Sequence, residues 1–269
     1  MRYRVGLSCG GAGKEICEET FQNCRAVGIE AIEISVDKTK YHEIPYQELP
    51  VWSKKYDVEV WSIHLPFSVS MKIDISSEEE EVRKGTVSYF KEIIEKASAA
   101  GIHRFVVHPS CEPIEEDVRA QKIKYSQESL NELAEYASQY GGVIAVENLP
   151  RTCLGRDSKE MLELISVNDK LRICFDTNHV LKEDLGTFAR KIGKYIETLH
   201  VSDCDFTNEK HWLPGEGKIN WGEIVDVLEE ANYTGVWMYE IGFKTPDNIK
   251  RERDLTFADF VENAKKILE

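Results

Sequence analysis

Short apolar runs alternate with longer amphipathic stretches eight times along the chain. The expected strands are 3–8, 31–36, 59–66, 104–110, 143–149, 171–177, 196–203 and 235–242. The helical stretches between and after them include 14–27, 78–100, 122–140, 158–167, 221–231 and 257–268. Such alternation implies parallel strands joined by crossover helices. Eight units in 269 residues match the usual size of a closed (β/α)8 barrel, so we predict an α/β fold with one TIM barrel domain spanning residues 1–269.

Glycine follows several of the expected helices, where it supplies the left-handed residue that ends a helix. The positions are Gly28, Gly101, Gly141-Gly142 and Gly235. At the start of the stretch 221–231, Asn220 is expected to cap the helix, with Glu223 completing a capping box. These signals predict where helices begin and end.

Histidines and acids gather where the expected strands end. The residues there are Glu33, His64, His108, Glu147, Asp176, His200 and Glu240. His179 and His211 lie in the loops that follow two of these strands, so five of the seven histidines lie at or just beyond a strand end. In TIM barrels the chemistry is carried by the C-terminal ends of the strands. The sequence therefore predicts one polar site at that end of the barrel.

The alternation of side chains along a strand places two of these acids on the inner face. Glu147 shares a face with Ala145, and Glu240 shares a face with Met238, whereas the bulky Trp237 and Tyr239 would point outward to the helices. A carboxylate in such an apolar position is costly unless it is paired or coordinated. Both glutamates are therefore candidates for binding a cation.

Four of the strand-end residues form the predicted metal site: Glu147, Asp176, His200 and Glu240. Three carboxylates and one imidazole are hard ligands whose summed charge a divalent cation would largely offset. Oxygen and imidazole ligands suit Mn, Mg, Co or Zn and do not choose among them. We expect a divalent metal as the cofactor.

The charge and the cysteines restrict the class of protein. The formal net charge is -14, which argues against nucleic acid as a partner, because phosphate contacts need a basic face. It also disfavours anionic membranes, and no apolar run is long enough to span a bilayer. Seven cysteines without a C-x-x-C pair indicate a reducing, cytoplasmic location. A neutral small substrate held by a metal fits this charge.

At these residues the chain resembles the xylose-isomerase-like barrel superfamily, which includes sugar isomerases and epimerases together with endonuclease IV. The resemblance spans essentially the whole chain. The segments that carry it are Glu147-Asn148-Leu149, Asp176-Thr177-Asn178-His179, His200-Val201-Ser202-Asp203 and His211-Trp212-Leu213-Pro214-Gly215-Glu216-Gly217. They occur in the family's order, on the expected strands.

Resemblance to the ketose 3-epimerases of this superfamily implies that the chain is a metal-dependent isomerase or epimerase of a sugar or sugar-like polyol. By that resemblance, Glu147 and Glu240 are both metal ligands and the acid–base pair. One takes a proton from the carbon beside the carbonyl, the other delivers one to the opposite face, and the metal stabilises the enediolate. His179 matches a family substrate contact. Where many of these epimerases carry an arginine six residues after the strand-seven histidine, this chain has Phe206. A homo-oligomer is compatible with this assignment.

Two alternatives stay open. Endonuclease IV is a metal-dependent phosphodiester hydrolase with more ions, and its additional ligands map onto His64, His108, His179 and His211, with Glu209 in place of its remaining aspartate. In a sugar enzyme the same four histidines would contact the substrate. The second alternative is a barrel that binds a metal or sugar without turning it over. The retained pair Glu147 and Glu240 and the acidic charge favour the isomerase.

Overall fold

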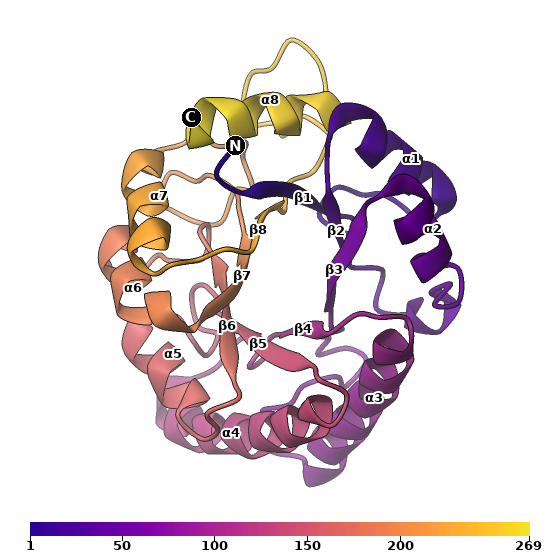
Figure 1. Ribbon diagram of the computed structural model, residues 1–269. Coiled ribbons are helices and arrows are strands. Elements are labelled where there is room, and N and C mark those ends of the chain that lie inside the picture. Colours follow the sequence, from indigo (N-terminus) through magenta and orange to yellow (C-terminus); the bar gives the residue numbers. More distant parts are fainter.

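Eight parallel strands form the wall of a barrel in the computed structural model, which describes all 269 residues (Figure 1). The strands are β1 (Arg4–Ser8), β2 (Ala31–Ile34), β3 (Glu59–His64), β4 (Arg104–Val107), β5 (Val143–Glu147), β6 (Arg172–Asp176), β7 (Ile196–His200) and β8 (Val236–Tyr239). Their hydrogen-bonded order is β7-β6-β5-β4-β3-β2-β1-β8. This order and the crossover helices confirm the predicted (β/α)8 TIM barrel fold.

The barrel closes between β7 and β8 through one residue beyond the regular strand. The backbone N–H of Val201 donates to the carbonyl of Met238 at 2.8 Å, and the N–H of Glu240 donates to the carbonyl of Val201 at 3.2 Å. Val201 and Tyr239 form an isolated parallel bridge rather than part of a ladder. We call this pairing of Val201 with residues 238–240 the seam of the barrel.

Eight α-helices surround the strands (Figure 1). They are α1 (Glu18–Val27), α2 (Leu49–Tyr56), α3 (Glu80–Ala99), α4 (Glu116–Ser138), α5 (Ser158–Ile165), α6 (Leu185–Ile192), α7 (Trp221–Glu230) and α8 (Phe257–Leu268), with two short 3-10 helices, η1 (Tyr41–Glu43) and η2 (Gly193–Tyr195). Helices α2 and α6 add to the six predicted stretches. Helix α4 begins six residues before the predicted 122, since Glu116 and Asp117 are acidic residues suited to a first turn.

The glycine signals are confirmed at three positions and wrong at the fourth. Gly28, Gly101 and Gly141 have positive φ angles of 93°, 85° and 69°. After α7 the left-handed residue is instead Asn232, with φ 56°. Gly235 is needed for space, because a Cβ at this position would lie 2.3 Å from the hydroxyl oxygen of Tyr233.

The predicted capping box at the start of α7 is only half present. The side chain of Asn220 accepts a hydrogen bond from the backbone N–H of Glu223 at 3.4 Å, so the cap itself is confirmed. The carboxylate of Glu223 does not return to the Asn220 backbone. It instead accepts from Arg190 on α6 at 2.9 Å, because the neighbouring helix offers a cationic partner.

The larger part of the core lies outside the barrel, between strands and helices. Small apolar clusters fill the interior, one of which consists of Val106, Ala145 and Cys174. A cluster of 65 buried residues lies between the strands and the helices and includes Trp237 and Tyr239. The hydroxyl of Tyr239 donates to Asn263 on α8 at 2.8 Å, so these two aromatic residues point outward as the alternation predicts.

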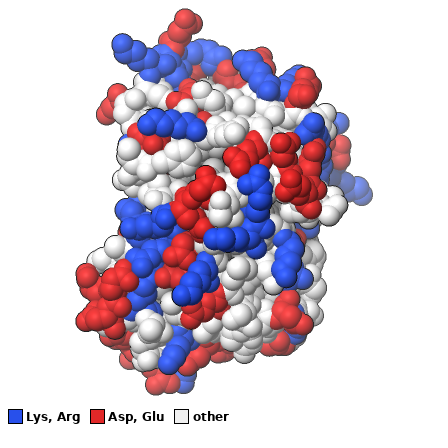
Figure 2. Space-filling model, turned by 90° about the vertical axis from the view of Figure 1, so that its left-hand side faces the viewer, with Lys and Arg blue, Asp and Glu red and all other residues white.

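Basic and acidic side chains are interspersed on the side of the barrel that carries α5, α6 and α7. Figure 2 shows Lys and Arg lying between Asp and Glu there, without a continuous basic stripe across this face. None of the helices combines the length and apolar character that a membrane span requires.

Candidate metal centre

The last residues of the final four strands meet at the C-terminal end of the barrel. Glu147, Asp176 and His200 end β5, β6 and β7, and Glu240 directly follows β8. Parallel strands all end at the same rim, so the four predicted ligands converge. One ligand atom from each lies within 4.8 Å of the others. The first three side chains are buried, and that of Glu240 is 17% exposed.

The ring of His200 lies at the centre of this four-residue group. Its Nδ1 is 3.4 Å from Glu147 Oε1, 3.5 Å from Glu240 Oε2 and 3.9 Å from Asp176 Oδ2. Neither His200 Nδ1 nor Asp176 Oδ2 has a hydrogen-bond partner, although both atoms are buried. A buried polar atom without a partner is costly, and two that face the same point fit a divalent cation between them.

The three carboxylates of this group differ in their acidity. Burial alone would raise the pKa of Glu147, but the facing His200, His108 and His179 hold it well below its usual range. Burial would also raise the pKa of Glu240, but His200, His211 and His64 together lower it below its ordinary value. The pKa of Asp176 is raised to about 7 by burial and by the charges of the two glutamates. An added cation would favour the ionised form of all three.

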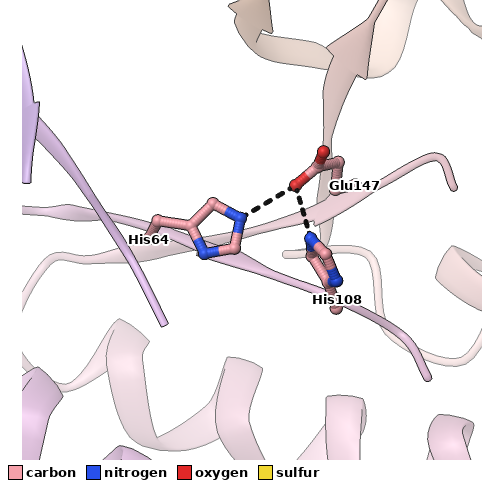
Figure 3. A group of neighbouring side chains, drawn as sticks. All are labelled: His64, His108 and Glu147. Atoms are coloured by element: carbon pink, nitrogen blue, oxygen red, sulfur yellow. Dashed lines mark hydrogen bonds and ion pairs between the residues drawn. The ribbon is translucent and has the colours of Figure 1, made fainter. Parts of the chain in front are cut away.

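A second group shares Glu147 with the first. His64 Nε2 and His108 Nε2 both face Glu147 Oε2, at 3.0 and 3.2 Å (Figure 3). Burial lowers the pKa of His108. It would also lower that of His64, but the carboxylate of Glu147 raises it above the ordinary value. Together the three side chains offer ligand atoms within 4.8 Å of one another.

A third group consists of His179, Glu209 and His211, again with ligand atoms within 4.8 Å of one another. His179 Nε2 lies 3.2 Å from Glu209 Oε2, and its Nδ1 lies 3.0 Å from the carbonyl oxygen of Asn148. Burial would lower the pKa of His179, but the surrounding carboxylates raise it well above its ordinary value. All eight residues predicted for the site thus lie at one end of the barrel.

Two residues that support the site were not assigned a role from the sequence. Glu33, buried at the end of β2, has its Oε1 2.9 Å from His200 Nε2 and accepts from Ser62 at 2.8 Å. The side-chain amide of Asn148 donates to the carbonyl of Asp176 at 2.9 Å and accepts from its N–H at 2.8 Å. The strand-end position of Glu33 was visible in the sequence, but its partner on β7 was not.

The loop after β7 is folded around the buried carboxylate of Asp203. This carboxylate accepts hydrogen bonds from the N–H groups of Gly215 at 2.7 Å and Ile219 at 3.1 Å and from the indole of Trp221 at 2.9 Å. Because the loop is tied at its end to the strand it leaves, its middle is held over the site. This places Glu209 and His211 beside His179.

A cavity of about 680 Å³ opens above the three groups. His64, His108, Glu147, His179, His211 and Glu240 all line it. The ring of Phe67 stacks on that of His108 with centroids 3.7 Å apart and forms part of the wall. Cavities of roughly 300–1,000 Å³ are typical of small-molecule sites.

Comparison with known proteins places this geometry in context. A family model described as xylose isomerase-like TIM barrel matches residues 21–258. An uncharacterized protein of Methanocaldococcus jannaschii is 32% identical over 68% of this chain, and the match spans 64% of that relative. A D-psicose 3-epimerase of Ruminiclostridium cellulolyticum is 26% identical over 86% of this chain and 81% of its own length.

The crystal structure of a D-tagatose 3-epimerase-like protein superposes with a TM-score of 0.82. It is 26% identical and covers 98% of this chain and 97% of its own. The relatives also include a probable endonuclease 4 of Aquifex aeolicus, 25% identical over 66% of this chain and 68% of its own length. The matched proteins thus include both sugar epimerases and an endonuclease.

Proposed function

The chain belongs to the xylose isomerase-like TIM barrel family, and from this premise we propose that it is a divalent-metal-dependent isomerase or epimerase of a sugar or sugar-like polyol. The observation that carries the proposal is the placement of Glu147 and Glu240. Both carboxylates approach the same nitrogen of His200, at 3.4 and 3.5 Å, at the floor of a cavity of small-molecule size. Relatives named D-psicose 3-epimerase and fructoselysine 3-epimerase support this choice.

In this proposal the four residues Glu147, Asp176, His200 and Glu240 would hold the metal. The unpartnered atoms Asp176 Oδ2 and His200 Nδ1 support the assignment, as do three acids whose charges otherwise repel one another. A divalent ion there would supply Lewis-acid stabilisation of negative charge on the oxygens of a sugar. The ligand set does not choose among Mn, Mg, Co and Zn.

The proposed acid–base pair is Glu147 and Glu240, which come from β5 and β8. Epimerisation beside a carbonyl requires one carboxylate to accept the proton from carbon and the other, protonated, to deliver one to the opposite face. The lowered pKa values favour the ionised form of both glutamates, which is the form that accepts a proton. The delivered proton is not the one removed, so a proton from water is expected to enter the product.

The four histidines around this pair would bind and orient the substrate. His64, His108, His179 and His211 line the cavity and carry ring nitrogens that can donate to or accept from sugar hydroxyls. Phe67 offers an apolar face beside them. We propose that residues 1–269 act as one domain on a small molecule.

Solvent isotope exchange tests this function directly. A panel of ketoses and inososes, free and phosphorylated, is incubated in deuterated water with the metal-loaded protein. The expected result is epimerisation of one class, with deuterium at the reacting carbon. Turnover without exchange would indicate a hydride shift between carbons, and the acid–base roles proposed for Glu147 and Glu240 would be wrong.

A second candidate function is a phosphodiester hydrolase of the endonuclease IV kind. The observation in its favour is that further ligand groups lie beside the four-residue one, and that Glu147 belongs both to that group and to the group with His64 and His108. The net charge of -14 weighs against a DNA substrate. Salt-sensitive cleavage of a duplex with an abasic site, absent in the Glu147→Gln variant, would favour the hydrolase over the isomerase.

A further inference from the structure

Arg151 lies in the loop after β5, between two carboxylates at the wall of the cavity. Its Nη1 donates to Glu209 Oε1 at 2.7 Å. Its Nε lies 3.2 Å from each carboxylate oxygen of Glu112, and its Nη2 also pairs with Glu112. The guanidinium therefore joins the loops that follow β4, β5 and β7.

The carboxylate of Glu209 is divided between this arginine and the third ligand group. One oxygen accepts from Arg151, and the other lies 3.2 Å from His179 Nε2. A metal ion bound by His179, Glu209 and His211 would therefore compete for a carboxylate that already pairs with a guanidinium. The two positive charges would also repel each other at short range.

The four-residue group has no such competitor. The ion pairs of Glu147, Asp176 and Glu240 all run to histidines, and none runs to a lysine or an arginine. A cation entering this group would meet carboxylates that no fixed positive charge neutralises. The structure thus distinguishes two groups that contain the same kinds of ligand.

The backbone conformation of Arg151 also indicates that its side chain has a specific role. Arg151 has a φ angle of 55°, in the left-handed region that non-glycine residues seldom adopt. His211, in the third ligand group, is also left-handed, with φ 51°. Such conformations persist where the surrounding contacts demand a particular side chain, often at functional sites. At position 151 those contacts are the ion pairs to Glu112 and Glu209.

We propose that Arg151 is a fixed cation that keeps the group His179, Glu209 and His211 free of metal, leaving Glu209 and His179 to contact substrate. The inference goes beyond the proposed function, since it concerns how many ions the cavity holds and does not depend on turnover. It makes Arg151 a determinant of metal stoichiometry and thus of the chemistry open to the site.

The test compares Zn²⁺ binding to wild type, Arg151→Gln and Arg151→Lys, by elemental analysis after dialysis and by calorimetry. Arg151→Gln is expected to bind one more Zn²⁺ ion per chain than wild type. Failing that, the Kd of its weakest-bound ion should be about tenfold lower than in wild type. Arg151→Lys keeps the charge and should resemble wild type. Arg156→Gln is the matched control, because Arg156 lies in the same loop but pairs with Glu116.

Two further variants make the result decisive. Arg151→Gly removes the charge while relieving the left-handed backbone, so it covers the case in which Arg151→Gln does not fold. Glu209→Gln added to Arg151→Gln should remove the extra ion. Equal stoichiometry and affinity in wild type, Arg151→Gln and Arg151→Gly would overturn the proposal, as would a wild type that already fills the third group.

Metal binding by the third group can be measured independently of the four-residue site. The same comparison is repeated in an Asp176→Ala, His200→Ala background, where the extra ion must still appear on loss of Arg151. A wild type without any tightly bound ion would count against the proposed function alone, because the gain on removing Arg151 is measured independently.

Discussion

Glu33 Oε1 lies 2.9 Å from His200 Nε2, and both side chains are fully buried. The contact joins β2 to β7 across the interior of the barrel. It directs the other ring nitrogen of His200, Nδ1, toward Glu147 and Glu240. A metal-binding histidine is commonly oriented by a carboxylate on its far nitrogen.

Replacing Glu33 is therefore expected to weaken metal binding without removing a ligand. Glu33→Ala should raise the metal Kd about 10–100-fold, the usual effect of losing such a partner. Calorimetric titration with Mn²⁺ or Zn²⁺ measures it. Ser62→Ala is the control, since it removes the other partner of Glu33 but leaves the contact to His200 intact. An unchanged metal Kd in Glu33→Ala would show that His200 does not need Glu33 to bind the metal.

The double variant Asp176→Ala, His200→Ala is expected to lose tight metal binding and remain folded. The barrel is held by its strand ladder and its 65-residue core, to which neither side chain belongs. Elemental analysis after dialysis measures the metal, and circular dichroism measures the fold. Full metal occupancy in this variant would refute the assignment of the four ligands.

Replacing either glutamate of the proposed acid–base pair should lower turnover much more than substrate binding. Glu147→Gln and Glu240→Gln keep the shape but lose the proton-accepting carboxylate, so kcat should fall about 10²–10⁴-fold. The assay uses saturating metal, because both residues are also proposed ligands. His42→Gln, in the exposed η1, is the control. Near-normal kcat in both glutamine variants would exclude the pair from catalysis.

The start of α8 should stabilise the fold at neutral pH and lose this stabilisation in acid. Asp259 accepts from the N–H and hydroxyl of Thr256, both at 2.6 Å, and pairs with Arg253 at 2.8 Å, which lowers its pKa. A lowered carboxylate pKa stabilises the fold above the unfolded value of about 4, and this stability is lost as pH falls further. Asp259→Asn should therefore cost about 1 kcal/mol near neutral pH.

The difference between wild type and Asp259→Asn should shrink as pH falls below about 4. Urea unfolding at several pH values measures both proteins side by side. A difference that is the same at neutral and at strongly acid pH would assign the effect to packing rather than to the charge of Asp259.

Gly235→Ala is expected to destabilise the protein although φ at this position is not left-handed. The new Cβ would lie 2.3 Å from the Tyr233 hydroxyl oxygen, which donates to the Val236 carbonyl at 2.9 Å. Displacing the ring should cost about 1–3 kcal/mol. Gly85→Ala in α3 is the matched control, with no atom near its Cβ, and should be neutral or stabilising. Equal melting temperatures for the two variants would contradict this.

The sequence predicted the fold and the four-residue group for the same reason. Parallel strands bring their ends together, so Glu147 and Asp176 could be expected to meet without coordinates. Pairings across the barrel or between loops depend on closure and on loop paths, which leave no local signal. The contact of Glu33 with His200 is a pairing across the barrel. The contact of Arg151 with Glu209 is a pairing between loops.

Two local signals were wrong, one of them because a more distant partner competed with the local one. Glu223 was expected to return to Asn220, but Arg190 on the neighbouring helix binds it. The signal at Gly235 was also wrong, because the left-handed residue after α7 is Asn232. Short-range rules describe what a segment prefers alone, and tertiary contacts of similar strength can override them.

The seam at Val201 links the closure of the barrel to the positions of His200 and Glu240 in the site. His200 precedes Val201 in the chain, and Glu240 donates its backbone N–H to the Val201 carbonyl. We therefore expect a ligand that draws His200 and Glu240 together to stabilise the two hydrogen bonds that close the ring of strands. By thermodynamic reciprocity, the free energy by which such a ligand stabilises this junction equals the free energy that binding would lose if the junction were opened. Hydrogen exchange at the amides of Val201 and Glu240 would then report occupancy of the site from the backbone itself.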